Sequence, residues 1–142
     1  PDVIKPGKSN ALFSQVDIFA SLAKLSGQKY PAGNVAPDSE DMSDVFIGKS
    51  SKGRKSMVQE SFTMSIRSGD WKYIAPVSRS TPDWLKNKDI ETGLQNSPQV
   101  YHLKDDPGEK SNLADNYPEK VKALSEELNR VKSNPAKTIQ GE

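Results

Sequence analysis

The sequence contains no cysteine, and this absence excludes a disulfide framework, a thiolate zinc site and a cysteine nucleophile. It also lacks long hydrophobic runs, since no window approaches the roughly 18 apolar residues that a membrane-spanning helix requires. Neither sign of charge is in surplus, because the formal net charge of the 142 residues is only +1. Phosphate binding needs a basic surplus on one face, so we expect no nucleic-acid partner and no membrane partner.

Motifs typical of catalysis are missing as well. The chain has no G-x-S-x-G nucleophile elbow and no glycine-rich phosphate loop. Its one histidine, His102, lies in an expected strand without a second histidine nearby, a setting more typical of a packed side chain than of a catalyst or metal ligand. The chain opens on Pro1 without an initiator methionine or a signal-like segment, so we expect that an upstream part was removed or not included.

The first part of the chain predicts one helix over residues 15–26. Ser14 can cap this helix, and Asp17 follows three residues later, as in a capping box. Gly27 comes directly after the last periodic residue, where a left-handed cap is expected. An irregular stretch follows and leads to a short helical turn expected over residues 43–47. One face of the helix carries an apolar stripe of Ile18, Phe19, Leu22, Ala23 and Leu25.

Beyond Gly53 the apolar period changes from helical to alternating, which predicts strands. Ser-Gly-Asp at residues 68–70 suits a hairpin turn between two of them. Residues 78–97 combine a proline and a glycine with mixed charges, so we expect a long surface loop without regular structure. A final helix is expected over residues 118–132, where apolar residues recur at spacings of three and four. The four expected strands are residues 56–61, 63–68, 70–77 and 98–103.

The stretch Tyr101 to Lys120, YHLKDDPGEKSNLADNYPEK, concentrates acidic and amide side chains. An EF-hand loop would require glycine at its sixth position and glutamate at its twelfth, and frames that begin at either of the paired aspartates provide neither. Asp-Asp-Pro-Gly at residues 105–108 is instead typical of a turn. Asn112, Asp115 and Asn116 can then accept hydrogen bonds from backbone amides ahead of the helix. We therefore predict a turn and a cap here rather than a metal site.

Tryptophan and basic residues outside this stretch could contact a ligand. The basic run Lys52 to Lys55, KGRK, is expected to be a solvated linker. Trp71 alternates with Tyr73, which indicates packing in a sheet. Trp84 lies in the expected long loop, where an exposed aromatic ring can mark contact with a partner or ligand.

Four segments of the chain resemble, in the same order and spacing, segments of one enzyme family. They are PDVIKPGKSNALFSQVDIFASLAKLSG, APDSEDMSDVFIGK, IRSGDWKYI and VYHLKDDPGEKSNLADNYPEKVKAL. The family is that of the formylglycine-dependent sulfatases, of the arylsulfatase type, in the alkaline-phosphatase-like superfamily. Each segment alone is a weak signal, whereas the four together are specific. The chain resembles the carboxy-terminal third of such an enzyme, over residues 1 to about 133.

The resemblance implies an α+β fold, in which a small antiparallel sheet of about four strands carries a carboxy-terminal helix and follows a helical remnant of an α/β catalytic domain. Residues 1–50 would be the final segment of the catalytic domain, and residues 51–142 the carboxy-terminal subdomain. The family hydrolyses sulfate esters with a formylglycine made in a C/S-x-P-x-R motif, which this chain lacks, and with a divalent cation, usually calcium. We therefore expect no catalytic residue, metal ligand or cofactor within the chain, and calcium and formylglycine in the missing upstream part.

The resemblance also implies that the subdomain lines one wall of the substrate cleft. The turn at residues 59–64 and the loop at residues 78–96 are the expected contributors, with Gln59 and Trp84 as candidate substrate-side residues. The expected partners are the missing catalytic domain and a sulfated glycan or aryl sulfate. Similarity to bacterial sulfatases implies a periplasmic or secreted location, and the chain alone is expected to be inactive.

Two expectations remain about partners. Without the catalytic domain the apolar stripe needs another cover, so residues 1–50 would lie on the small domain in a new way or join a second chain. Self-association would then use the face formed by Ile18, Phe19, Leu22 and Leu25. The alternative function is a free-standing module that binds a sulfated or acidic glycan through Trp84, Lys52, Arg54 and Lys55.

Overall fold

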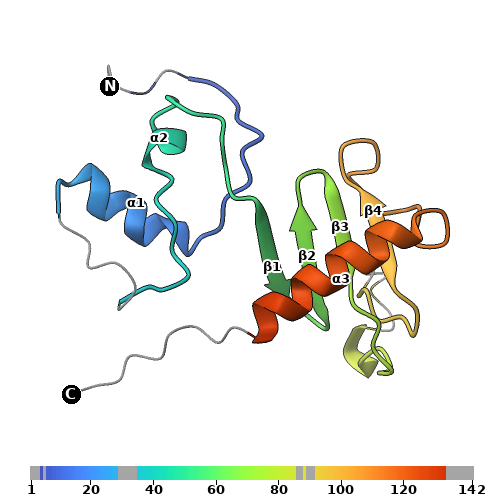
Figure 1. Ribbon diagram of the computed structural model, residues 1–142. Helices are drawn as coiled ribbons and strands as arrows, with labels where there is room; N and C mark the ends of the chain where they lie inside the picture. The colour runs from blue at the N-terminus through green and yellow to red at the C-terminus, as the bar shows by residue number, and fades with distance from the viewer. Residues whose placement is uncertain (1–3, 5, 29–34, 86–87, 89–91, 134–142) are drawn as a thin grey trace. The chain divides into compact units, whose positions relative to one another are not determined.

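The computed structural model describes residues 4, 6–28, 35–85, 88 and 92–133. Two compact units make up the chain, one that reaches to Met57 and one that comprises Val58–Ser133, and each is described by itself. No helix among the described residues is long and apolar enough to span a bilayer. In chain order the elements are α1 (Asp17–Leu25), α2 (Ser43–Phe46), β1 (Ser56–Glu60), β2 (Met64–Ser68), β3 (Trp71–Ile74), η1 (Asp83–Leu85), β4 (Gln99–His102) and α3 (Pro118–Ser133) (Figure 1).

Helix α1 begins at Asp17, with Val16 rather than Ser14 in the N-cap position. Half of the predicted capping box is present, because the amide of Ser14 donates to Oδ2 of Asp17 at 2.8 Å. At the other end Gly27 has a φ of 74°, and the amides of Gly27 and Gln28 donate back to helix carbonyls. This left-handed glycine with two returning hydrogen bonds confirms the predicted carboxy-terminal cap.

Helix α1 turns its more polar face inward, with Asp17, Ala20 and Ser21 as its buried residues. Oγ of Ser21 donates to the carbonyl of Asp17 at 2.6 Å and accepts from the amide of Met42 at 2.9 Å, which ties the segment before α2 to the helix. The large side chains of the predicted apolar stripe are exposed instead. Their exposed fractions are 38% for Ile18, 48% for Phe19, 56% for Leu22 and 46% for Leu25.

The four strands form one antiparallel sheet, as expected, and their order in it is β1-β2-β3-β4. Strands β2 and β3 are a hairpin whose register pairs Ile66 with Tyr73, and Gly69 in its turn has a φ of 58°. That positive φ is the conformation for which glycine is favoured in a tight hairpin turn. Strand β4 pairs with β3 and places Val100 opposite Tyr73.

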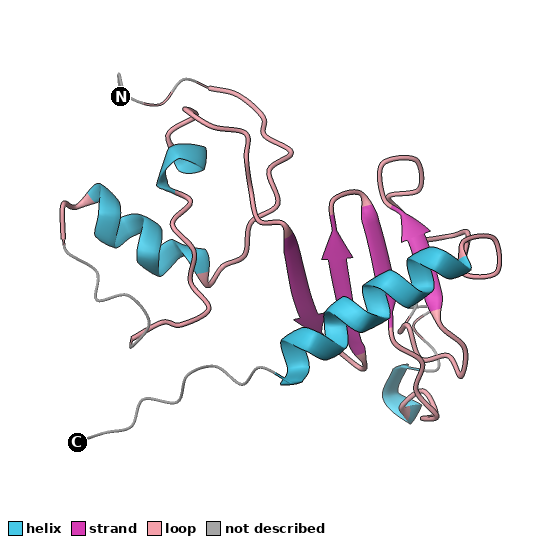
Figure 2. Cartoon of the chain, in the orientation of Figure 1, coloured by secondary structure: helices cyan, strands magenta, loops and turns pink. Residues whose placement is uncertain are grey.

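Helix α3 lies across one face of this sheet (Figure 2) and contacts β2, β3 and β4. Alternate strand residues and the buried face of the helix form the core between the two layers. Each large apolar side chain buried there contributes about 1.5–3 kcal/mol. The buried core residues are Ile66, Tyr73, Val100, Ala114, Leu124 and Leu128, with Val58, Met64, Trp71, Ala75 and Val121 packed around them.

The expected structureless loop over residues 78–97 contains one regular element, the 3-10 helix η1. Leu85 at its end is only 4% exposed, so an apolar anchor holds this turn against the rest of the unit. At the other end of the loop, the side-chain amide of Gln99, the first residue of β4, donates to the carbonyl of Gly93 at 2.9 Å. Composition alone did not indicate this element, because a single buried leucine carries no periodic signal.

Candidate functional site

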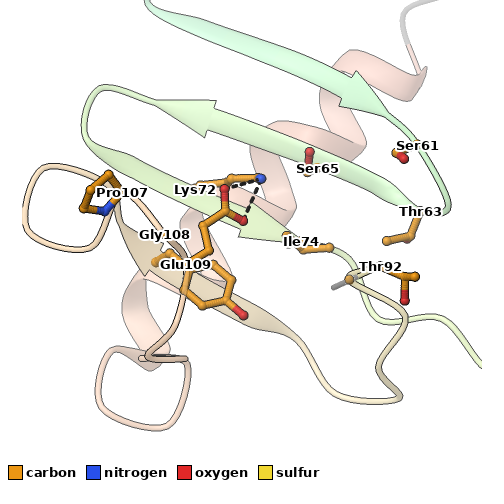
Figure 3. A pocket seen from close by; sticks show the side chains of 11 residues that line it. Ser61, Thr63, Ser65, Lys72, Ile74, Thr92, Pro107, Gly108 and Glu109 are labelled. Atoms are coloured by element: carbon orange, nitrogen blue, oxygen red, sulfur yellow. Dashed lines mark hydrogen bonds and ion pairs between the residues drawn. The ribbon is translucent and has the colours of Figure 1, made fainter. Parts of the chain in front are cut away.

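A groove of about 370 Å³ lies on the face of the sheet opposite to α3 (Figure 3). Side chains of a strand alternate between its two faces, so the residues next to core positions point into this groove. Lys72 and Ile74 of β3 are examples, since Tyr73 between them belongs to the core. We call this feature the outer groove; its lining includes Ser61, Thr63, Ser65, Lys72, Thr92, Tyr101 and Glu109.

An ion pair between Lys72 and Glu109 lies in the outer groove. Nζ of Lys72 donates to Oε1 and Oε2 of Glu109 at 2.7 Å and 2.8 Å. Glu109 belongs to the turn that follows β4 and has a φ of 52°, a conformation uncommon for residues other than glycine. The pair therefore holds an acidic turn over β3 and makes it one wall of the groove.

Hydroxyl groups supply much of the remaining polarity of the outer groove. Oγ1 of Thr63 donates to the carbonyl of Ala75 at 3.0 Å, and the phenol of Tyr101 donates to Oε1 of Gln99 at 2.8 Å. A hydroxyl that donates its proton to the protein keeps lone pairs that accept hydrogen bonds. Such groups suit a ligand with many hydroxyls, whereas the charge of Lys72 is already compensated by Glu109.

The two segments expected to border a substrate cleft both reach the outer groove. The turn after β1 contributes Ser61 and Thr63, and the loop before β4 contributes Thr92 and Gly93. Gln59 is exposed at the end of β1 and is not part of the lining, so its substrate-side role stays a prediction.

Trp84, the other candidate, lies on η1 outside the groove lining and is 64% exposed. Its ring centroid is 6.2 Å from that of Phe62, and Nζ of Lys88 lies 5.7 Å from the Trp84 ring. Its proposed contact with a ligand also stays a prediction.

Sequence reasoning did not single out Lys72 or Glu109. The alternation of Trp71 and Tyr73, which was used to predict packing, also places Lys72 on the opposite face. The pairing of Lys72 with Glu109 joins residues 37 positions apart, and no local pattern reveals such a contact.

The acidic stretch forms the predicted turn, and Asn112, one of its three expected capping residues, accepts hydrogen bonds from backbone amides. The carboxylate of Asp106 accepts from the amides of Ser111 and Lys110 at 2.9 Å and 2.8 Å, and these bonds lower the pKa of Asp106 below its ordinary value. Oδ1 of Asn112 accepts from the amides of Val100 and Ala114 at 3.0 Å each. These contacts confirm that the stretch organises backbone amides.

The side chains of the same stretch are poorly arranged to bind a metal ion. Nδ1 of His102 lies 2.6 Å from Oδ2 of Asp105, and the carboxylates of Asp106 and Glu109 bind amides and Lys72. Within the part of the chain that the structure describes, no three acidic or histidine side chains are grouped to hold a metal ion. The carboxylates of Asp106 and Glu109 are already bonded to other groups of the protein.

The basic run before β1 was expected to be a solvated linker, but Arg54 within it is largely buried. Its side chain is only 13% exposed and forms ion pairs with Asp17 and Glu40. Lys52 is exposed. Because the charge of Arg54 is compensated within the chain, this residue is poorly suited to the alternative glycan-binding role.

Comparison with known proteins points to one family, although no family model matches the chain. An N-acetylgalactosamine-6-O-sulfatase of Bacteroides thetaiotaomicron is 43% identical over 136 residues, which cover 94% of this chain and 26% of that protein. Arylsulfatase A of Bos taurus is 27% identical over 98% of this chain and 30% of its own length. Arylsulfatase A of Homo sapiens is 28% identical over 89% of this chain and 28% of its own length. The chain thus spans only 26% to 30% of the curated relatives it matches.

Comparison with solved structures agrees with the sequence comparison. A structure determined in work on the metabolism of multiple glycosaminoglycans by Bacteroides thetaiotaomicron has a TM-score of 0.85 and 43% identity, and the match covers 94% of this chain and 28% of that one. Another, in complex with its substrate D-glucosamine-2-N,6-O-disulfate, has a TM-score of 0.62 over 100% of this chain and 29% of its own, and at 22% identity it shows the fold alone. The chain therefore belongs to the sulfatase family and corresponds to a carboxy-terminal portion of an arylsulfatase-type member.

Proposed function

We propose that this chain is the carboxy-terminal part of a sulfuric ester hydrolase that acts on a sulfated sugar, and that it completes the fold and forms one wall of the substrate cleft. The N-acetylgalactosamine-6-O-sulfatase of Bacteroides thetaiotaomicron matches 94% of the chain at 43% identity, so we infer a 6-O-sulfated N-acetylhexosamine as the substrate class. In this proposal the catalytic centre lies in the missing catalytic domain, and the chain alone is inactive.

The outer groove is the observation that supports this proposal. It lies where the turn at residues 59–64 meets the loop at residues 78–96, the two segments that the family resemblance assigns to the cleft. Its walls offer hydroxyls and one charged pair, which suit the hydroxyls of a sugar better than an apolar ligand. In the proposed role these side chains bind and orient the sugar while the ester bond breaks elsewhere.

The chemistry of sulfate transfer is assigned to groups outside this chain. By family resemblance, a formylglycine and a calcium ion in the upstream part supply the nucleophile and the compensating positive charge when present. The residues of this chain contribute binding and orientation only. The same resemblance supports a periplasmic or secreted location.

Two assays test the proposal. The isolated chain should release no chromophore from 4-nitrophenyl sulfate, and turnover that a chelator blocks would overturn its assigned inactivity. The product of the complete gene should carry a C/S-x-P-x-R motif and release sulfate from N-acetylgalactosamine 6-sulfate; a gene product without that motif or activity would overturn the assignment.

Two substitutions test the outer groove in the complete gene product. Thr63→Val and Thr92→Val keep the side-chain volume but remove a hydroxyl, and each should raise KM roughly twofold to tenfold, the equivalent of one hydrogen bond. Thr81→Val, which lies outside the lining, is the matched control and should leave KM unchanged. Unchanged KM in all three variants would remove the groove from the proposal.

A second candidate function is a free-standing module that binds a sulfated or acidic glycan. The exposed ring of Trp84 beside Lys88 favours it, whereas the paired state of Arg54 weakens the part assigned to the basic run. Binding of the isolated chain to a glycan array, together with absence of the C/S-x-P-x-R motif from the gene, would favour this candidate.

A further inference from the structure

An exposed aromatic surface lies beside one end of the outer groove. Trp84 is 64% exposed, and its ring is in tilted contact with Phe62 at a centroid distance of 6.2 Å. Phe62 lies between Ser61 and Thr63, both of which line the outer groove. We call Trp84, Phe62 and Lys88 the aromatic ledge.

The exposure of Trp84 is not explained by the packing of its own turn. Leu85, the next residue, is 4% exposed and anchors η1, while Trp84 turns its indole outward. A tryptophan carries a large apolar surface, so leaving it in water forgoes a substantial burial free energy. Such exposed rings frequently mark surfaces that bind a partner or ligand.

The chemistry of the ledge favours an anionic sugar as its ligand. The electron-rich face of an indole attracts the polarised C–H groups on the apolar face of a pyranose ring, while the ring hydroxyls stay in water. Lys88 places its ammonium 5.7 Å from the Trp84 ring, so positive charge lies next to that surface. A sugar that bears a carboxylate or sulfate would satisfy the ring and the ammonium together.

We propose that the aromatic ledge is a second sugar-binding position, which stacks an anionic sugar adjacent to the one held in the outer groove. This inference rests on the proposed function, because it takes the outer groove as the place of the sulfated sugar. It extends that function by making the preferred ligand an oligosaccharide rather than a single sugar. The ledge contributes to binding and takes no part in the reaction.

The test compares two probes on the 142-residue chain by tryptophan fluorescence and calorimetry. One probe is N-acetylgalactosamine 6-sulfate, and the other is a tetrasaccharide that alternates glucuronate with the same sulfated sugar. The tetrasaccharide should bind more tightly, by about fivefold to tenfold, the range expected for one additional stacked ring. Equal affinities for the two probes would overturn the inference.

Substitutions test which residues cause the higher affinity for the tetrasaccharide. Trp84→Ala should abolish the advantage of the tetrasaccharide without changing binding of the monosaccharide, and Trp84→Phe should retain part of it. Lys88→Gln should weaken tetrasaccharide binding about threefold at low salt, whereas Lys104→Gln, an exposed lysine after β4, should leave it unchanged. A tetrasaccharide advantage that survives in Trp84→Ala would overturn the assignment.

A neutral tetrasaccharide of N-acetylglucosamine tests the charge requirement and should bind more weakly than the anionic one. Equal affinity for the neutral and the anionic tetrasaccharide would show that Lys88 does not contribute to binding at the ledge. These measurements report binding only, while the proposed function fails separately if the complete gene product releases no sulfate. Absence of tetrasaccharide binding by the chain would overturn the ledge and leave the sulfatase assignment untouched.

Discussion

Arg54 and Asp17, 37 positions apart in the sequence, form a doubly hydrogen-bonded ion pair that joins the segment before β1 to the first turn of α1. Nε of Arg54 donates to Oδ2 of Asp17 at 2.7 Å, and Nη2 donates to Oδ1 at 2.5 Å. The Asp17 side chain has no exposed surface, and it also accepts from the amides of Ser14 and Glu40. The inward face of α1 is thus held by a satisfied polar network while its apolar stripe is exposed.

Asp17→Asn tests the strength of this pair. The substitution keeps the shape of the side chain but leaves the charge of the largely buried Arg54 without its main partner, which typically costs about 3–5 kcal/mol. We expect a lower urea midpoint and faster hydrogen exchange in α1. Glu40→Gln is the matched control, because Glu40 is 55% exposed and its loss should cost less than about 1 kcal/mol. Equal midpoints for the two variants would contradict the assigned role of Asp17.

Acid should destabilise the fold through the same carboxylate. Burial alone raises the pKa of Asp17, but the bonds from Arg54 and from the amides of Glu40 and Ser14 outweigh burial, and the pKa is lowered. A lowered pKa in the folded state gives stability that is present above the unfolded value, about 3.9 for aspartate, and is lost as pH falls through the folded value.

The urea midpoint should therefore be flat near neutral pH and fall below about pH 4. Asp106 acts in the same direction, since the amides of Ser111 and Lys110 lower its pKa too. Asp17→Asn should flatten the acid limb of the curve measured by urea titration at successive pH values. An acid limb that keeps its full slope in this variant would show that other groups dominate it.

Gly53→Ala should disrupt the neighbouring backbone. A Cβ at this position would lie 2.2 Å from the carbonyl oxygen of Leu12, which accepts the amide of Arg54 at 2.7 Å. Real Cβ atoms essentially never approach so closely, so the two strands of chain must move apart and weaken the Arg54 ion pair. We expect a loss of about 1–3 kcal/mol in urea unfolding. Gly48→Ala is the control. A Cβ at Gly48 would meet open space, so this variant is strained only by its φ of 73° and should lose less stability.

Local patterns predicted the elements but not the contacts between distant segments. The periodic apolar residues of α1 and α3, Gly27 at the helix end and the hairpin at Gly69 were predictable because each depends on residues close in sequence. The turn at Asp106 was predictable for the same reason, since its carboxylate binds amides four and five residues away.

The features that sequence reasoning missed depend on tertiary structure. Arg54 was interpreted as part of a solvated linker, because nothing in KGRK indicates a partner 37 residues earlier. The pairing of Lys72 with Glu109, which builds one wall of the outer groove, is hidden for the same reason. By contrast, helix α1 begins at Asp17 rather than at the predicted residue 15, because the amides of Asp17 and Ile18 donate to carbonyls only three residues earlier and form a turn ahead of the helix.

Substitution of Glu109 separates backbone strain from the ion pair. Glu109→Gln removes the charge that compensates Lys72 and should destabilise the second unit by about 1 kcal/mol, since both side chains remain partly exposed. Glu109→Gly removes the same charge but relieves the positive φ of 52°, so it should cost less than Glu109→Gln. Thermal unfolding of both variants measures the difference, and a glycine variant less stable than the glutamine one would contradict this account.

The exposed face of α1 predicts the solution behaviour of the isolated chain. Ile18, Phe19, Leu22 and Leu25 are 38–56% exposed on one helix, and apolar side chains gathered in this way favour association in water. When the chain is studied without the proposed catalytic domain, we expect a second copy of the chain to cover this face and light scattering to give a mass above that of the monomer. Leu22→Glu should restore the monomer, whereas Lys24→Gln, an exposed residue on the same helix, should not. A monomeric wild-type chain in which the amides of α1 are fully protected from hydrogen exchange would refute association through this face.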